Sequence, residues 1–120
     1  MARPVVHFEI QSKDAAKARE FYSKVFDWKI DANNPMQYGM VEAGDGGIGG
    51  GIAPRQDANM PGVTVYIDVP DLAAALAQVK AAGGRTIVEP TTIPGTVSFA
   101  LFADPDGNVV GLTASDVPPA

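Results

Sequence analysis

Residues 69–84, VPDLAAALAQVKAAGG, contain the signals for the start, the body and the end of one helix. Asp71 stands where an N-cap residue belongs, because its side chain can accept a hydrogen bond from a backbone N–H of the first turn. Strong helix formers follow, and then the Gly83–Gly84 pair, which suits the left-handed end of a helix. The preceding residues 63–69 are rich in β-branched side chains. The segment therefore predicts a strand that runs directly into a helix.

The same order of signals occurs once earlier in the chain. Residues 5–10 alternate between polar and apolar side chains, Asp14 is placed as an N-cap, and residues 15–26 carry apolar side chains, Phe21 and Val25 among them, at helical spacing. Short β-type segments separated by turn formers follow each helix. These predicted strands are residues 28–31, 37–43 and 48–53 in the first half and residues 86–89, 97–103 and 108–114 in the second, with a loop at residues 90–95.

The repeated order predicts an α+β fold of two βαβββ modules in one domain of 120 residues. Module one spans residues 4–54, a linker rich in turn formers spans residues 55–62, and module two spans residues 63–115. Side chains alternate between the faces of a strand, and each helix must cover the apolar face. The polar faces then point the other way, so we expect a curved mixed sheet that forms a cup, with both helices outside.

The polar face of the first strand in each module supplies the candidate site residues. They are His7 and Glu9 in module one, and Thr64, Tyr66 and Asp68 in module two. Glu9 and Asp68 are candidate general bases and His7 a candidate acid, because carboxylates and imidazoles exchange protons near neutral pH. An alternative is that these side chains simply face water in an open cup. The apolar residues Val65, Ile67 and Val69 are expected beneath the second helix, and the sequence leaves open which faces Tyr38, Phe99 and Phe102 take.

Gly111 interrupts the apolar run of the last predicted strand, where a residue without a side chain weakens a strand. Gly51 is its counterpart, because a shift of 60 residues aligns the two. One interpretation is a β-bulge or close packing against the strand. The other is that the missing side chain leaves space inside the cup, and the sequence does not decide between them.

Composition and charge restrict the classes of function that are possible. The formal net charge is −5, and the nine Lys and Arg side chains form no basic stripe, so we expect no nucleic-acid partner. Cysteine is absent, which excludes disulfides and Cys-ligated metals and is compatible with a reducing compartment. No apolar run reaches the length of a membrane span, and the first residues lack the apolar core of a signal peptide. We expect a cytoplasmic protein that binds a small molecule and no membrane.

Three parts of the chain together resemble the vicinal oxygen chelate superfamily, which includes glyoxalase I, extradiol dioxygenases and bleomycin-resistance proteins. They are the His7 strand with its capped helix and residues 25–28 (VFDW), residues 69–84, and the turn at residues 104–108 (DPDGN) before the last strand. The resemblance covers nearly the whole chain. It implies paired βαβββ modules around an open cup, often in a homodimer.

Metal-dependent members of that superfamily take their ligands from four strand positions. The resemblance places these positions at His7, Gly51, Thr64 and Gly111. Only His7 coordinates a divalent metal well, and a catalytic site needs about three protein ligands. We therefore expect no metal and no other cofactor.

The leading hypothesis is a protein that binds or sequesters a small molecule in the cup without metal, as the bleomycin-resistance type does. An alternative is a glyoxalase-like lyase or isomerase, or a dioxygenase-type enzyme, that uses His7, Glu9 and Asp68 for acid–base chemistry or completes a metal site in a homodimer. A third is a structural or regulatory module that keeps the fold without the site. The expected ligand contacts are His7, Glu9, Thr64, Tyr66, Gly51 and Gly111.

Overall fold

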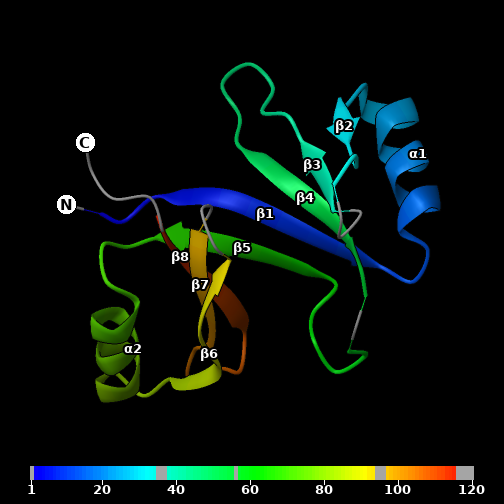
Figure 1. The fold of residues 1–120 in the computed structure, drawn as a ribbon. Helices are drawn as coiled ribbons and strands as arrows, with labels where there is room; N and C mark the ends of the chain where they lie inside the picture. The colour runs from blue at the N-terminus through cyan, green and yellow to red at the C-terminus, as the bar shows by residue number, and fades with distance from the viewer. Residues whose placement is uncertain (1, 35–37, 56, 94–96, 116–120) are drawn as a thin grey trace. The chain divides into compact units, whose positions relative to one another are not determined.

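The computed structural model describes residues 2–34, 38–55, 57–93 and 97–115 (Figure 1). These residues contain two helices and eight strands, which confirms the predicted α+β class. The chain forms two compact units: the first comprises residues 6–64, and the second runs from Val65 onward and includes the N-terminal residues up to Val5. The division between the units thus falls within the strand that begins module two.

The first unit contains one helix and a mixed sheet. Its elements are β1 (Val5–Ser12), α1 (Ala15–Phe26), β2 (Ile30–Asp31), β3 (Gly39–Val41) and β4 (Gly49–Pro54). The strands lie in the order β2-β3-β4-β1, in which β1 is parallel to β4 and the other neighbours are antiparallel. The helix packs against β4.

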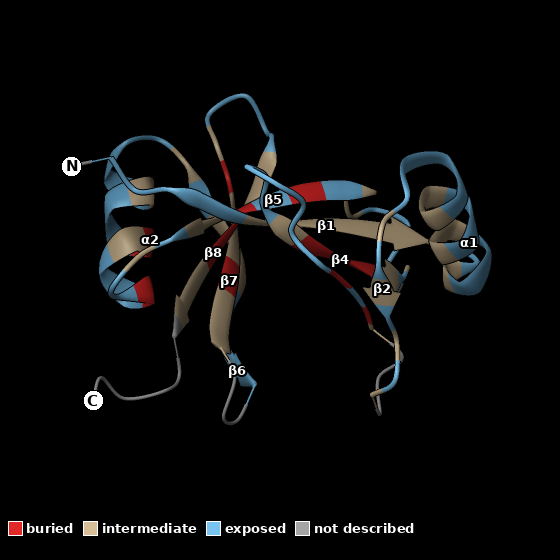
Figure 2. Cartoon of the chain, turned by 90° about the horizontal axis from the view of Figure 1, so that it is seen from above, coloured by how far each residue is buried: buried red, intermediate tan, exposed pale blue. Residues whose placement is uncertain are grey.

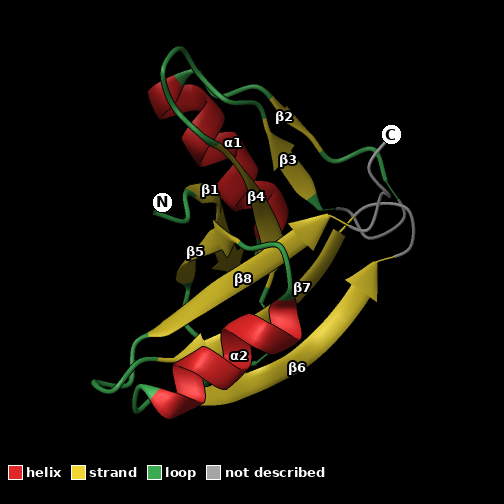
Figure 3. Cartoon of the chain, turned by 90° about the vertical axis from the view of Figure 1, so that its left-hand side faces the viewer, coloured by secondary structure: helices red, strands yellow, loops and turns green. Residues whose placement is uncertain are grey.

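The second unit repeats this topology. Its elements are β5 (Val63–Asp68), α2 (Leu72–Ala81), β6 (Arg85–Ile93), β7 (Val97–Ala103) and β8 (Val109–Ser115). The strand order is β5-β8-β7-β6, with β5 parallel to β8 and the others antiparallel, and α2 packs on β6, β7 and β8 (Figure 3). In both units the first strand pairs with the last one of its own module, as a duplicated βαβββ unit requires.

Both helices begin at the residues that the sequence predicted. The carboxylate of Asp14 accepts a hydrogen bond from the backbone N–H of Lys17, and that of Asp71 accepts one from Ala74, each at 3.1 Å. Such a cap stabilises a helix by about 1 kcal/mol. At the end of α2, Gly83 has a φ of 99°, which favours glycine because a Cβ is strained there.

The turn before β8 also follows the sequence prediction. Oδ1 of Asp104 accepts hydrogen bonds from the backbone N–H groups of Asp106 and Asn108, both at 2.9 Å. Gly107 has a φ of 89°, which a residue with a side chain rarely adopts. Hydrogen bonds, first of all from the side chain of Asn108, hold the pKa of Asp104 below its usual value.

Strand β6 differs most from its prediction. The sequence predicted a short strand at residues 86–89 and then a loop, whereas β6 continues to Ile93. Its pairing with β7 shifts between Val88 and Thr91, where Pro90 lies. Such an irregularity accommodates a proline, which cannot donate a hydrogen bond to the ladder. The end of the predicted loop lies outside the described residues.

The second and third strands of the first unit are shorter than predicted. β2 has two residues and β3 has three, whereas the sequence predicted residues 28–31 and 37–43, of which residue 37 lies outside the described part. The ladder pairs Ile30 with Val41 and Asp31 with Met40. These two residue pairs form the β2–β3 ladder, and turn-forming residues flank both strands.

The second unit has a compact apolar core beneath α2 (Figure 2). Its buried members are Leu72, Leu76, Ala100 and Leu112, and Ile67, Val69 and Phe102 pack against them. Ile67 and Val69, two of the three residues expected under the helix, are therefore there. The prediction is wrong for Val65, which is 38% exposed.

Helix α1 contributes no fully buried residue. Phe21 and Val25, which helical spacing places among its apolar residues, are 55% and 54% exposed, so the spacing alone does not identify a buried face. Tyr22 instead carries the contact with the rest of the unit, because its ring stacks on Trp28 at a centroid distance of 5.0 Å. Trp28 in turn meets Phe8 of β1 at 5.3 Å. These aromatic contacts near the C-terminal end of α1 add to its packing against β4.

Candidate functional site

Tyr38 joins the polar side chains of β1 into one hydrogen-bonded chain. Nε2 of His7 lies 2.9 Å from the hydroxyl oxygen of Tyr38, and this hydroxyl donates to Oε2 of Glu9 at 3.2 Å. The side-chain amide of Gln11 donates to Oε1 of Glu9 at 2.9 Å. We call these four side chains the Tyr38 network. Strand alternation placed His7 and Glu9 on one face, as the sequence predicted, but the sequence did not place Tyr38 beside them.

Tyr38 is fixed by its backbone as well as by its hydroxyl. The side chain of Asn34 accepts a hydrogen bond from the backbone N–H of Tyr38 at 2.9 Å and donates one to its carbonyl oxygen at 2.7 Å. The residue therefore enters β3 with both backbone polar groups paired to one side chain. This arrangement directs the ring from the start of β3 towards β1.

The ring of Tyr38 lies over Gly51 on β4. A Cβ built on Gly51 would collide with the end of this ring. In the second unit, a Cβ on Gly111 would collide with the ring of Tyr66. Close packing, one of the two interpretations that the sequence left open, therefore explains both glycines, because a tyrosine ring occupies the space over each.

The remaining predicted site residues have different surroundings. Thr64 and Tyr66 are buried, at 8% and 7% exposure, whereas Asp68 is exposed. The backbone N–H of Asp68 donates to the carbonyl oxygen of Pro4 at 2.9 Å. Of the predicted acid–base residues, the structure brings His7 and Glu9 together through Tyr38 in the first unit. Phe99 is half-buried on β7.

Burial lowers the pKa of His7 below its usual value of 6.5, and the carboxylate of Glu9 opposes this effect by favouring the charged imidazolium. The imidazole is half-buried, which makes the loss of hydration the larger influence. A pKa below the ordinary value favours the neutral form of His7 near neutral pH. The network therefore holds a neutral imidazole near a carboxylate, with a phenol between them.

The side chains in the first unit do not fit a metal centre with three protein ligands. Of the strand positions that bear ligands in metal-dependent relatives, only His7 carries a strong donor in this unit, and Gly51 lies beneath a phenol ring. Among the residues that the structure describes, no three His, Cys, Asp or Glu side chains gather as a metal site requires. Glu9 also uses both carboxylate oxygens as hydrogen-bond acceptors.

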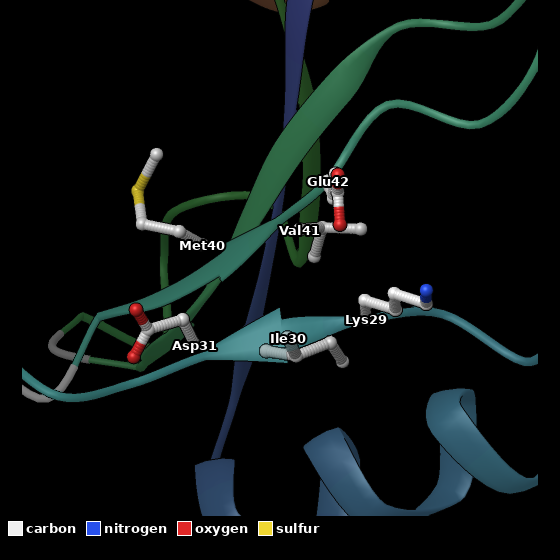
Figure 4. Close-up of a pocket in the computed structure, with 6 residues that line it drawn as sticks. All are labelled: Lys29, Ile30, Asp31, Met40, Val41 and Glu42. Atoms are coloured by element: carbon white, nitrogen blue, oxygen red, sulfur yellow. The ribbon is translucent and has the colours of Figure 1, made fainter.

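Two surface grooves lie apart from the network. The first has a volume of about 400 Å³ and follows the β2–β3 edge (Figure 4); it is lined by Lys29, Ile30, Asp31, Met40, Val41 and Glu42. The second, of about 530 Å³, runs between α2 and β6 and is lined by three alanines, Leu76, Thr86 and Pro90, together with Lys80 and Glu89. No residue of the Tyr38 network lines either groove.

The family model described as the Glyoxalase/Bleomycin resistance protein/Dioxygenase superfamily matches residues 5–112, and the chain belongs to this superfamily. The match includes all the strands and both helices up to the middle of β8. It agrees with the family resemblance inferred from the motifs.

Curated relatives are similar to this chain over part of their own length. It is 41% identical over 78 residues to the Mycobacterium bovis protein CFP32, which carries a provisional glyoxylase name; the match covers 62% of this chain and 28% of that protein. It is 29% identical over 117 residues to the anthracycline biosynthesis protein DnrV of Streptomyces peucetius, covering 83% and 42% of the two chains. This chain thus spans less than half the length of either relative.

Methylmalonyl-CoA epimerase from Mycobacterium tuberculosis has a similar fold. The TM-score is 0.69 at 16% identity, with 95% of this chain and 88% of that chain covered. At this identity the likeness concerns the fold alone.

Among the described residues, neither helix is long and apolar enough to cross a membrane.

Proposed function

We propose that this chain binds a small molecule without a metal, at a site built around His7, Tyr38 and Glu9. The observation that carries the proposal is the Tyr38 network, in which a half-buried imidazole and a carboxylate are held in fixed positions by a phenol. A set of polar groups with fixed donors and acceptors on a strand face orients a ligand. In this proposal the chain sequesters its ligand in the same way as the bleomycin-resistance type of protein in this superfamily.

The other predicted contacts remain part of the proposal. Thr64 and Tyr66 are ligand contacts in it, and Gly51 and Gly111 contribute through the tyrosine rings that cover them. DnrV is named for anthracycline biosynthesis, which favours planar polycyclic compounds as the first class to test.

We also propose a homodimer in the cytoplasm. The resemblance to the superfamily supports this part, because open cups of this kind are often completed in a homodimer. Light scattering at micromolar concentration tests this part, and a monomer would contradict it.

Ligand binding is tested by thermal shift and calorimetry with the metal-free protein. The panel contains anthracyclinones, α-keto acids and glutathione adducts, and at least one class is expected to bind stoichiometrically in the presence of a chelator. His7→Ala and Tyr38→Phe are expected to weaken this binding at least tenfold, whereas Val25→Ala on the exposed face of α1 leaves it unchanged. One tightly held metal equivalent per chain after loading with nickel, zinc, manganese or iron would overturn the proposal.

A second candidate function is acid–base catalysis of the lyase or isomerase kind. The link from His7 through Tyr38 to Glu9 favours it, because an acid and a base in hydrogen-bond contact can exchange protons with a bound substrate. Asp68 remains a further candidate base. Turnover of the α-keto or glutathione-adduct compounds that Glu9→Gln abolishes would support catalysis, and stoichiometric binding without turnover would support sequestration.

A further inference from the structure

We infer that Tyr38 is a positioning residue that holds His7 in the tautomer with its proton on Nε2, so that the hydrogen bonds run in one direction from His7 to Glu9. The inference rests on the proposed function only in assigning His7 a role at the ligand. Its geometrical basis is the pair of contacts at the Tyr38 hydroxyl, 2.9 Å to His7 and 3.2 Å to Glu9.

The direction follows from counting protons. A phenol has a single proton to donate, and an ionised carboxylate only accepts. Both carboxylate oxygens of Glu9 accept hydrogen bonds, one from Gln11 and one from Tyr38. Because the phenol proton is directed to Glu9, the contact between Tyr38 and His7 requires a proton on Nε2 of the imidazole.

The tautomer has a chemical consequence for a bound molecule. A neutral imidazole with its proton on Nε2 carries its lone pair on Nδ1 and is an acceptor there. When a bound O–H or acidic C–H group transfers its proton to Nδ1, the Nε2 proton can move to the oxygen of Tyr38 while the phenol proton moves to Glu9.

This transfer balances in atoms and charge. Bonds to hydrogen form at Nδ1, at the Tyr38 oxygen and at Oε2 of Glu9, and those at the ligand, at Nε2 and at the phenol break. The imidazole and the phenol end neutral, Glu9 becomes a neutral acid, and its negative charge appears on the ligand. Glu9 is then the final proton acceptor, and the Tyr38 hydroxyl connects it to the imidazole.

The test needs no ligand, because His7 is the single histidine of the chain. In the ¹⁵N-labelled protein at pH 7.5, two-bond ¹H–¹⁵N correlations report which imidazole nitrogen carries the proton. We expect Nε2–H as the single observed tautomer. A spectrum of the Nδ1–H form would overturn the inference directly, without any variant.

Tyr38→Phe removes the acceptor oxygen while keeping the ring over Gly51. In this variant we expect a mixture of tautomers and at least a tenfold faster exchange of the Nε2 proton with water. Tyr22→Phe is the matched control, since Tyr22 lies in the aromatic cluster at Trp28, and its spectrum should match the wild type. Backbone amide spectra verify that both variants are folded.

A Tyr38→Phe spectrum identical to that of the wild type would also overturn the inference. Because these measurements use the ligand-free protein, their failure leaves small-molecule binding to be decided by calorimetry. The absence of binding, in turn, would leave the assigned tautomer standing.

Discussion

The two units fill equivalent positions in different ways. Glu9 on β1 pairs with Gly51 on β4, and Tyr66 on β5 pairs with Gly111 on β8. In the second unit the paired residue itself lies over its glycine. In the first unit the paired residue is a carboxylate, and the covering ring is that of Tyr38, from outside β1 and β4.

The comparison shows that the residue paired with the glycine decides whether this position of the repeated topology becomes part of a core or of a polar site. In the second unit this residue is Tyr66 on β5, and it is buried. Where a glutamate takes that place, a tyrosine from elsewhere must cover the glycine, and its hydroxyl meets His7 and Glu9. A partly buried hydroxyl is stabilised by such partners, because an unpaired polar group shielded from water is destabilising.

The largest expected effect contrasts the two helices. Leu76→Ala should lower the free energy of unfolding by about 2–5 kcal/mol, because Leu76 is buried in the core of the second unit. Val25→Ala on α1 should change it by less than about 0.5 kcal/mol, since Val25 is largely exposed. Urea unfolding of both variants measures the difference. Equal losses would show that α1 is covered in solution.

The next effect distinguishes the two glycines. Gly111→Ala should lower the free energy of unfolding by about 1–3 kcal/mol, because the new methyl group meets the base of the Tyr66 ring, which cannot easily move aside. Combined with Tyr66→Ala, the loss should be less than the sum of the two single losses. Additive losses in urea would mean that the ring does not cover Gly111.

Gly51→Ala should lower the free energy of unfolding less than Gly111→Ala does, but it should perturb the Tyr38 network more. The methyl group meets the far end of the Tyr38 ring, which can swing aside at a loss of about 1 kcal/mol or less. That movement separates the hydroxyl from His7 and Glu9, so the imidazole spectrum should resemble that of Tyr38→Phe. An unchanged imidazole signal in a folded Gly51→Ala protein would contradict the placement of Tyr38.

The smallest effect is on the pH dependence of stability. Burial lowers the pKa of His7 in the folded state, so the unfolded chain binds a proton more readily. The neutral side chain therefore contributes its full stability above the unfolded pKa of about 6.5, and this contribution falls as pH decreases through the folded pKa. His7→Gln should remove this part of the pH profile, measured by urea unfolding from about pH 8 to about pH 5.

Glu9 provides the control for this profile. Its carboxylate raises the pKa of His7 against the effect of burial, so Glu9→Gln should lower that pKa further and extend the loss of stability to lower pH. A rise of the imidazole pKa in Glu9→Gln, followed by NMR titration, would contradict the electrostatic influence of Glu9 on His7.

The elements of the fold could be predicted because their signals are local. Asp14 and Asp71 lie next to the helices that they cap, and alternation along β1 fixed the shared face of His7 and Glu9. These features depend on neighbours within a few residues. The order of strands and helices follows from them.

The covering of Gly51 could not be predicted from local signals. Tyr38 reaches Glu9 across 29 residues of sequence, from a position that depends on the hydrogen bonds of Asn34. The only sequence signal was the glycine itself, which marks a close approach without naming the partner. The exposure of Phe21 likewise depends on tertiary packing, which helical spacing alone does not specify.

The rings over the two glycines make a carboxylate hard to introduce. A glutamate at position 51 would displace the far end of the Tyr38 ring and disrupt the Tyr38 network, and one at position 111 would collide with the base of the Tyr66 ring, which cannot easily move aside. The change at position 111 therefore needs a second substitution before its new side chain has room, and the change at position 51 costs the hydrogen bonds of Tyr38. A laboratory attempt to build a metalloenzyme on this scaffold should begin by shrinking the tyrosines.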